Sequence, residues 1–288
     1  MTEGNAAEPD QVRDMFDRIS PVYDAMNALI SGFQEPHWRR RAAAAVGPRP
    51  GMAVIDVACG TGALAAEIHR RVSPGGTVLG VDFAPRMIAR ARRRHPGRPG
   101  LLFVVGDALA LPARDASFDA ATIAFGMRNL ADFRRGFAEM ARVVRPGGRV
   151  VCLEIARPRG LGARLLATWF ERAVPLLGRL AGHRDAYAYL VRSVRDYPSP
   201  ERVAAIMANA GLSGVRWVTR SRGMVTLHVG ERRSDNFACR RLPAALANNQ
   251  PADSIDDVST TKPGRSHEPA QRGSARGRSR SVSAREPG

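Results

Sequence analysis

The sequence predicts an α/β fold: a doubly wound, mostly parallel sheet of seven strands, with helices before it and a tail after it. From residue 53 onward, short apolar runs alternate with helical patterns, which is typical of a parallel sheet covered by helices on both faces. The first run ends in the glycine turn Gly60-Thr61-Gly62. The last two runs, near 214–220 and 224–230, flank Ser221-Arg222-Gly223, which indicates a hairpin.

The elements follow in order along the chain. Residues 11–46 have helical patterns, and Pro21 ends the first helix or begins a second one because proline lacks an N–H. Residues 47–51 form a linker, and the Pro-Gly-Gly of 145–148 predicts a sharp turn before the fifth strand. The remaining strands are expected at 53–57, 77–81, 101–105, 119–124 and 149–154, and the remaining helices at 62–72, 85–94, 132–144, 161–193 and 200–210, the last closed by Gly211 as C-cap.

Three segments are expected: a flexible N-terminus at 1–10, one folded domain at 11–240, and a disordered basic tail at 241–288. The tail is rich in Pro, Ser, Gly and Arg and has no periodic apolar pattern, so it cannot bury enough surface to offset its ordering entropy. Its stretch RGSARGRSRSVSAR is similar to arginine-rich segments that contact nucleic acid non-specifically. An extension with no specific role is the alternative.

Composition favours a cytoplasmic protein. Of the 288 residues, 44% are hydrophobic, yet no apolar run reaches the roughly 20 residues that a membrane-spanning helix needs. The N-terminal stretch MTEGNAAEPDQVRD lacks an apolar signal-peptide core. Cys59, Cys152 and Cys239 are far apart and odd in number, so we expect neither a disulfide framework nor a cysteine-based metal site.

The formal net charge is +17, and nearly all of the positive charge is arginine; Lys262 is the single lysine. A coding bias toward arginine would explain this composition. Charge of this size nevertheless attracts polyanions, so anionic membrane surfaces and nucleic acid are candidate partners.

The glycine turn predicts a nucleotide-cofactor site, because a strand, a glycine turn and a helix N-terminus form such sites. The spacing of Gly60, Gly62 and Ala65 also fits a dinucleotide fingerprint. Asp56 decides between cofactors. It stands four residues before Gly60, where a carboxylate would repel a pyrophosphate but attract the cationic groups of S-adenosylmethionine (SAM).

Two more acidic residues follow consecutive strands. Asp82 ends the second strand, where a carboxylate can accept hydrogen bonds from both ribose hydroxyls. Asp107 follows the third strand and precedes Ala108; it can accept a hydrogen bond from the adenine amino group. Three carboxylates at the ends of three consecutive strands fit SAM well, although each is also compatible with a solvated loop.

The motifs D-x-A-C-G-T-G, V-D-F-A-P-R-M and G-D-A-x-x-L-P together resemble class I SAM-dependent methyltransferases. The resemblance extends to the quinone C-methyltransferases of menaquinone and ubiquinone biosynthesis and covers residues 11–232. The stretches that carry it are VRDMFDRISPVYDAMNALIS at 12–31, FGMRNLAD at 125–132, RVVRPGGRVVCLEIARP at 142–158, YLVRSVRDYPSPE at 189–201 and GMVTLHVG at 223–230.

This resemblance implies methylation, by SAM and without a metal, of a ring carbon in a prenylated hydroquinone. Demethylmenaquinol is the preferred substrate. Methylation of a benzoquinol in ubiquinone biosynthesis, methylation of another small molecule, and an arginine-rich nucleic-acid-binding protein are the alternatives. Prenyl length and oligomeric state stay open.

The implied cofactor site includes Phe83 and also Ala124, which replaces a serine that some relatives carry. In full it is Asp56, Gly60, Thr61, Gly62, Asp82, Phe83, Asp107, Ala108 and Ala124.

The implied chemistry lies after the fourth strand and in the N-terminal helices. Arg128 would stabilise a developing phenolate and Asn129 would orient the ring oxygen, while Asp24 is a candidate general base. Tyr23 and Asn27, four residues apart, share a helix face and would line the substrate pocket beneath an N-terminal lid, together with Phe125 and Glu154. A surface role for Arg128, a packing role for the helix and a structural ion pair for Glu154 are the alternatives.

The segment 161–182 is apolar on one face and carries arginines on another. It is expected to pack on the core, or to form an apolar wall or a membrane-facing surface for the prenyl tail. A basic protein that handles a lipid would then contact the inner face of an anionic membrane peripherally.

Overall fold

The computed structural model describes residues 4, 8–155, 172, 174, 178–179, 182–221 and 223–234. The predicted tail at 241–288 and most of the predicted helix segment 161–182 lie outside these residues. The helices are α1 Pro9–Ile19, α2 Tyr23–Ile30, α3 Glu35–Ala45, α4 Ala63–Val72, α5 Pro85–Arg94, α6 Phe133–Val143, α8 Arg184–Asp196 and α9 Pro200–Asn209, with a 3₁₀ turn at Met127–Asn129.

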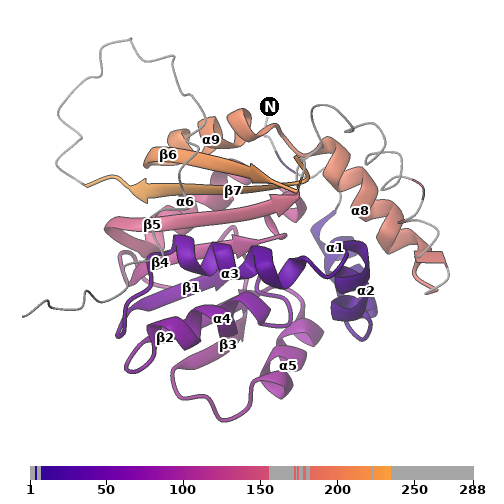
Figure 1. Cartoon of the computed structure of the whole chain (residues 1–288), viewed down its shortest axis with the longest axis horizontal. Helices are drawn as coiled ribbons and strands as arrows, with labels where there is room; N and C mark the ends of the chain where they lie inside the picture. The colour runs from indigo at the N-terminus through magenta and orange to yellow at the C-terminus, as the bar shows by residue number, and fades with distance from the viewer. Residues whose placement is uncertain are drawn as a thin grey trace, which may run out of the picture. The chain divides into compact units, whose positions relative to one another are not determined.

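The strands form one seven-stranded sheet in the order β3-β2-β1-β4-β5-β7-β6 (Figure 1). Neighbouring strands are parallel from β3 to β5, and β7 runs antiparallel to both β5 and β6. This confirms the predicted doubly wound, mostly parallel fold. The strands are β1 Ala53–Val57, β2 Thr77–Asp82, β3 Leu101–Val105, β4 Phe118–Ala124, β5 Val144–Ile155, β6 Leu212–Arg220 and β7 Val225–Arg232.

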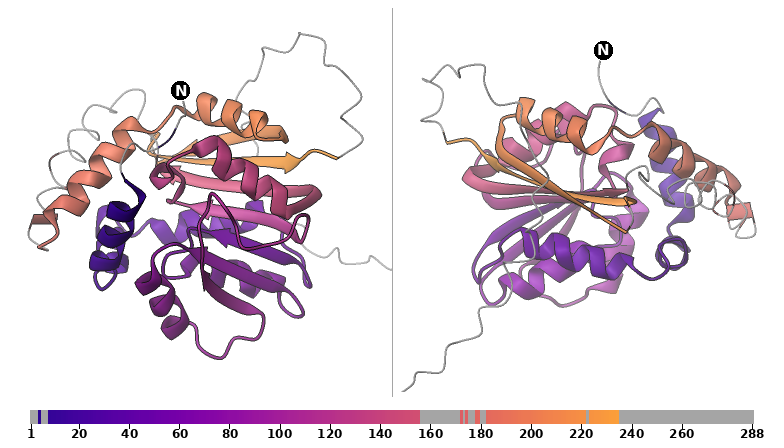
Figure 2. Two further views of the ribbon diagram at one scale, coloured as in Figure 1. Left: turned by 180° about the vertical axis from the view of Figure 1, so that it is seen from behind. Right: turned by 45° about the horizontal axis from the view of Figure 1, so that its top comes forward.

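Helices cover both faces of the sheet and bury two apolar cores (Figures 1 and 2). One core joins α3, α4 and α5 to the sheet, and includes Trp38, Leu64 and Ile88. The other lies under α6 and α9 and includes Phe137 and Met207. The central strands are mostly apolar on both sides because both faces are covered, so β1 and β4 are largely hydrophobic apart from residues such as Asp56 and Thr122.

Helices α1, α2 and α8 lie together beyond the sheet and share a third apolar cluster (Figure 1). Helix α1 begins at Pro9, inside the segment predicted to be flexible, because proline suits the first turn of a helix. The expected break at Pro21 is confirmed, since α1 ends at Ile19 and α2 starts at Tyr23. These helices lie at the end of the sheet that carries the glycine turn Gly60-Thr61-Gly62 (Figure 1).

Two expected elements differ from the structure. The Pro-Gly-Gly segment is not a turn ahead of the fifth strand: β5 already begins at Val144, which pairs with Phe118, and the register then shifts so that Arg149 pairs with Ala120. The extra residues bulge out while both ends stay paired. The predicted helix 161–193 is interrupted at Gly182, whose φ is +73°, and α8 starts only after it and runs on to Asp196.

The carboxyl end of β1 forms the predicted strand–turn–helix unit. Gly62 caps α4 with a φ of +80°, and a Cβ there would lie 2.6 Å from the ring of Phe103, so only glycine fits.

In the part of the chain that the structure describes, we find no helix long and apolar enough to cross a bilayer. Those same residues contain no cluster of three acidic, histidine or cysteine side chains arranged to hold a metal ion.

Candidate active site

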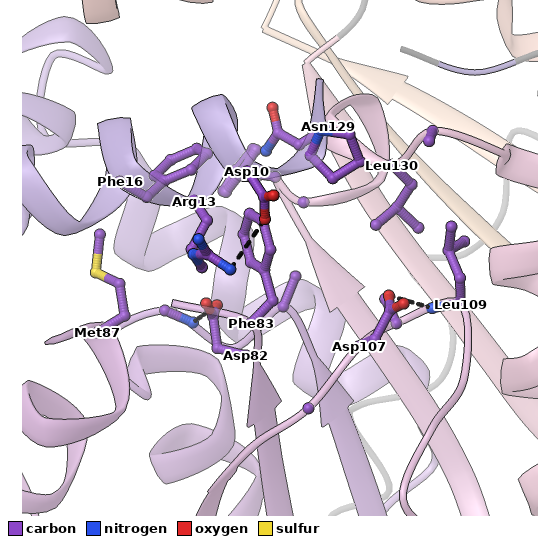
Figure 3. A pocket seen from close by; sticks show the side chains of 18 of the residues that line it. Asp10, Arg13, Phe16, Asp82, Phe83, Met87, Asp107, Leu109, Asn129 and Leu130 are labelled. Carbon is purple, nitrogen blue, oxygen red and sulfur yellow. Dashed lines mark hydrogen bonds and ion pairs between the residues drawn. The ribbon is translucent and has the colours of Figure 1, made fainter. Parts of the chain in front are cut away.

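A cavity of about 260 Å³ lies at the carboxyl ends of β1 to β4, closed on the outer side by α1 (Figure 3). Its floor comes from the loops that follow these strands. The described residues that line it are Pro9, Asp10, Arg13, Phe16, Tyr23, Ala58, Gly60, Asp82, Phe83, Met87, Gly106, Asp107, Ala108, Leu109, Phe125, Gly126, Asn129, Leu130 and Ala131.

A second cavity of about 40 Å³ lies beside the first, between α2, α3, α8 and the start of β7. Tyr23 and Phe125 line both cavities and therefore form the wall between them. The smaller cavity is mostly apolar, and Arg128 is its basic lining residue. Its described lining is Tyr23, Asn27, Ile30, Ser31, Glu35, Trp38, Phe125, Arg128, Ile155, Leu190, Met224 and Val225.

Asp82 is fixed at the end of β2 by two backbone groups. The N–H of Gly60 donates to Oδ2 at 2.8 Å, and the N–H of Ala84 donates to Oδ1 at 2.9 Å. Burial raises the pKa of this carboxyl to about 6, although the two N–H groups oppose the shift. The side chain lines the larger cavity, so its remaining lone pairs can accept hydrogen bonds from a ligand there, as the sequence predicted for ribose hydroxyls.

Asp56 lies beneath the glycine turn rather than in the cavity lining. Its Oδ1 accepts a hydrogen bond from Thr122 at 2.7 Å, whereas its buried Oδ2 has no partner. Burial raises the pKa of Asp56 to about 7. A buried carboxylate with one unsatisfied oxygen is costly, and a cation nearby would lower that cost. This orphan oxygen fits the predicted attraction of a cationic ligand through the field rather than by direct contact.

The other predicted cofactor residues divide in two. Gly60, Phe83, Asp107 and Ala108 line the larger cavity as expected, and Asp107 Oδ1 accepts a hydrogen bond from Leu109 N–H at 2.8 Å. Thr61, Gly62 and Ala124 are buried outside the cavity lining.

Asp24 lines neither cavity. Its Oδ1 accepts a hydrogen bond from Thr61 Oγ1 at 2.8 Å, and its Oδ2 lies 2.5 Å from Arg94 Nη1 of α5. The carboxylate therefore ties α2 to the glycine turn and to α5. The general-base role that the sequence suggested for Asp24 stays a prediction.

Phe125 holds a strained position between the cavities. Its φ is +60°, a value that bulky residues rarely adopt, and its N–H donates to Leu153 of β5 at 2.8 Å. The guanidinium of Arg39 lies 5.4 Å from the centre of its ring, and the ring of Trp38 meets it edge-on at 6.2 Å. Strain and packing together fix the ring as part of the wall.

Arg128 and Glu154 form a buried ion pair beside the smaller cavity. The two side chains are 8% and 1% exposed, and Nη1 of Arg128 lies 2.5 Å from Oε1 of Glu154. The same Nη1 donates to the carbonyl of Phe125 at 2.7 Å, while Nε of Arg128 is buried without a partner. Glu154 thus holds Arg128 against Phe125 in the dividing wall, and the Nε–H of Arg128 is left without an acceptor.

Tyr23 and Asn129 add polar groups on opposite sides of the wall. Burial raises the pKa of the Tyr23 phenol, so it stays protonated and can donate a hydrogen bond. Asn27 interacts with this hydroxyl one helical turn later, as the shared helix face predicted. Asn129 lines the larger cavity, and its Oδ1 accepts a hydrogen bond from Tyr189 of α8 at 3.1 Å.

Several lining residues were missed by the sequence reasoning. Arg13 and Phe16 point from α1 toward the larger cavity above Phe83 and Asp82 (Figure 3). The stretch 12–31 signalled a lid, but not which of its side chains would face the ligand. Met87 is the last residue of the V-D-F-A-P-R-M motif, so the motif could have indicated that Met87 lines the cofactor cavity.

Comparison with known proteins decides the family. The profile of the ubiE/COQ5 methyltransferase family matches residues 4–232. A demethylmenaquinone methyltransferase from Thermus thermophilus is 45% identical over 222 residues, which cover 76% of this chain and 100% of that protein. The chain belongs to the ubiE/COQ5 methyltransferase family. A ubiquinone/menaquinone biosynthesis C-methyltransferase from Geobacter sulfurreducens is 39% identical over 227 residues, covering 77% of this chain and 89% of that one.

Solved structures of more distantly similar proteins share the fold. A SAM-dependent methyltransferase from Thermotoga maritima superposes with a TM-score of 0.54 at 18% identity, covering 76% of this chain and 99% of that chain. The cyclase SpnF superposes with a TM-score of 0.58 at 17% identity, covering 81% and 98%. Membership of the family makes this ubiE/COQ5 protein a methyltransferase, and SAM is the methyl donor that the family and the fold support.

Proposed function

We propose that this enzyme methylates a ring carbon of a prenylated hydroquinone, with demethylmenaquinol as its substrate. The observation that carries the proposal is the wall shared by two cavities. Tyr23 and Phe125 separate a larger polar-floored cavity from a smaller apolar one. A methyl donor in the first and an aromatic ring that widens the second would come into contact between the side chains of Tyr23 and Phe125. Relatives named demethylmenaquinone methyltransferase, 36–45% identical to this chain, support the choice of ring.

The residues of the larger cavity fit SAM. Asp82 would accept hydrogen bonds from the ribose hydroxyls, Asp107 and Ala108 would border the adenine, and the buried charge of Asp56 would favour the cationic methionine end. Gly60 leaves room for the ligand where any side chain would enter the space beside Tyr23. When bound, the cofactor supplies an electrophilic methyl group.

The protein's contribution is to activate the ring carbon. An aromatic carbon is a weak nucleophile until its neighbouring hydroxyl gives up a proton, so the reduced quinol is the reactive form. Arg128 would stabilise the negative charge on that oxygen through its unused Nε, with Glu154 holding the guanidinium in place. The protonated Tyr23 would donate a second hydrogen bond, and Asn129, which lines the larger cavity, would orient the ring oxygen where the ring meets the methyl donor. The packed wall excludes water around these groups.

The experiment that tests the function measures transfer of labelled methyl from SAM to demethylmenaquinone with and without a reductant. We expect incorporation only under reducing conditions, and its loss in Arg128→Gln with SAM binding retained. Arg145→Ala, which removes a surface arginine paired with Asp119, is the matched control and should remain active. SAM binding without incorporation into the naphthoquinol would contradict the proposed substrate, and a benzoquinol, suggested by the Geobacter relative's name, would be tried next.

We also propose a cytoplasmic enzyme that meets its lipid substrate at the inner face of the membrane. The net charge of +17 favours anionic lipids. For the arginine-rich tail at 241–288 we propose at most a salt-sensitive, non-specific contact with nucleic acid. Deleting the tail separates the two roles, because methylation should survive while nucleic-acid binding is lost. Loss of methylation would contradict an accessory tail.

A further inference from the structure

The last turn of α2 and the loop that joins it to α3 present two large apolar side chains to solvent. Phe33 is 74% exposed and Leu29 is 46% exposed. The other large hydrophobic residues exposed among the described residues, Leu102 and Val105, belong to the edge strand β3 and its end. Single exposed apolar residues are common on protein surfaces. A largely exposed aromatic ring next to a substrate cavity, in contrast, suggests a contact with another molecule.

The backbone of Phe33 is strained. Gly32 and Phe33 have φ values of +57° and +62°, and the Phe33 N–H donates to the carbonyl of Ala28 at 2.7 Å, which closes the end of α2. Glycine adopts this left-handed conformation freely, whereas a bulky residue there is strained. Asparagine would satisfy the same geometry at lower cost. Strain of this kind at an exposed aromatic residue is typical of a functional position.

The exposed residues Leu29 and Phe33 are close in sequence to residues that line the smaller cavity. Ile30 and Ser31, inside the turn, line that cavity. The turn is also braced against the β6–β7 hairpin, because Ser221 donates to the side chain of Gln34 at 3.1 Å and accepts a hydrogen bond from Trp38 at 3.1 Å. Residues 29–33, which we name the docking turn, are therefore a rigid apolar edge of the substrate cavity.

The charges around the docking turn favour an anionic surface. The two carboxylates on the flanking helices are both neutralised: Asp24 pairs with Arg94, and Glu35 pairs with Arg39. Helix α3 carries Arg40 on its exposed side, and Arg41 donates to the ring of His37. The apolar turn is thus followed directly by a helix that carries Arg40 and Arg41, and neither flanking helix has an unpaired carboxylate.

We propose that the docking turn inserts Leu29 and Phe33 into an anionic phospholipid bilayer and places the smaller cavity against the lipid that carries the substrate. This inference rests on the proposed function for its substrate but is read from the turn itself. Apolar side chains flanked by cations are what an interfacial membrane contact requires. Segment 161–182, for which the sequence also predicted a membrane-facing surface, lies mostly outside the described residues.

The test compares three full-length proteins on vesicles of phosphatidylcholine alone and of phosphatidylcholine mixed with phosphatidylglycerol. The turn variant carries Leu29→Gln and Phe33→Asn, which preserve helix propensity and the left-handed conformation. The control variant carries Leu102→Gln on β3. We expect the wild type to bind the anionic vesicles and to release at high salt, and the turn variant to bind at least about tenfold more weakly because it lacks two insertable side chains. The control should bind within about twofold of wild type.

Activity is measured on two forms of the quinol. On a water-soluble short-chain quinol, all three proteins should be equally active; on the long-chain quinol in anionic vesicles, the turn variant should be about tenfold slower. Equal vesicle binding by wild type and turn variant would overturn the inference. So would a wild-type dimer that the turn variant dissociates, since a second copy would then cover the turn. Vesicle binding as expected, but no methylation of either quinol, would support the docking turn and overturn the proposed function.

Discussion

Nη1 of Arg128 lies 2.5 Å from Oε1 of Glu154, and both side chains are buried next to the wall between the two cavities. Because the arginine follows β4 and the glutamate ends β5, the pair exists only when these two strands are side by side. It therefore connects the central sheet to the chemistry proposed above.

Removing one member of this pair should destabilise the fold. Glu154→Gln leaves a buried guanidinium without a counter-ion, and we expect the free energy of unfolding to fall by about 3–5 kcal/mol. The double variant Arg128→Met, Glu154→Leu removes both charges and should recover most of that loss while staying inactive. Urea unfolding and methyl transfer measure the two effects. Wild-type activity in the double variant would reduce the pair to a structural role.

The affinity for SAM should depend on pH through Asp56. The pKa of this carboxyl is raised to about 7 by burial, so below that pH it is increasingly neutral and no longer attracts a cation. The dissociation constant should therefore rise as pH falls below 7, by up to about tenfold per pH unit, until binding itself holds the group ionised. Calorimetric titration from about pH 5 to about pH 8 measures this.

Two variants check the assignment to Asp56. Asp56→Asn should flatten the dependence, leaving the weaker contribution of Asp82, whose pKa is raised to about 6. Thr122→Val removes the hydrogen bond that lowers the Asp56 pKa, so it should move the midpoint to higher pH. An unchanged profile in Asp56→Asn would exclude this carboxylate as the source.

His228 should make the protein less stable in acid. Burial lowers its pKa to about 4, and its Nε2 lies 3.0 Å from the carbonyl of Pro200. In the unfolded chain this histidine takes up a proton near pH 6.5, whereas in the folded protein it does so only near pH 4. The free energy of unfolding is therefore unaffected by protonation of His228 above pH 6.5 and decreases as the pH falls from 6.5 to about 4. The full loss is about 3 kcal/mol.

The difference between wild type and His228→Leu isolates this effect. Asp56 and Asp82 act in the opposite sense, because their raised pKa values favour the folded state in acid. That contribution is lost as the pH rises to about 7 for Asp56 and about 6 for Asp82. The variant loses a hydrogen bond at every pH, so the slopes of unfolding free energy against pH are compared rather than its absolute values. Parallel curves for the two proteins would rule out a buried neutral histidine.

A methyl group at Gly126 should disturb the floor of the larger cavity. A Cβ there would lie 2.6 Å from the Cβ of Ala58, which itself lines the cavity with a φ of +51°. We expect Gly126→Ala to weaken SAM binding about tenfold or more, because overpacking costs about 1–3 kcal/mol. Ala58→Gly removes the clashing atom and relieves its own backbone strain, so the double variant should regain affinity. Failure of this rescue would show that the clash is not the cause.

The sequence was sufficient for the framework of the site. Alternating apolar runs specified the parallel strands, and the carboxyl ends of such strands converge at one edge of a sheet, which brought Asp82 and Asp107 to a common cavity as predicted. The glycine turn followed from local conformation, because Gly62 has a left-handed backbone that other residues avoid. Tyr23 and Asn27 interact as their four-residue spacing predicted, since a helix sets that geometry by itself.

Only the tertiary structure decided which of these side chains face a ligand. The sequence suggested an ion pair as one alternative for Glu154 and none for Asp24, and it named no partner for either. Arginines 70 and 26 residues away along the chain pair with Asp24 and Glu154, respectively. Arg13 reaches the cavity because α1 packs across it, which the sequence did not indicate. The exposure of Phe33 in the part of the chain that the structure describes was also decided by the tertiary structure. Periodicity and motif spacing describe contacts within one element, whereas ion pairing, lid placement and exposure depend on how distant elements pack. That packing determines which charges are neutralised and which apolar surface stays open.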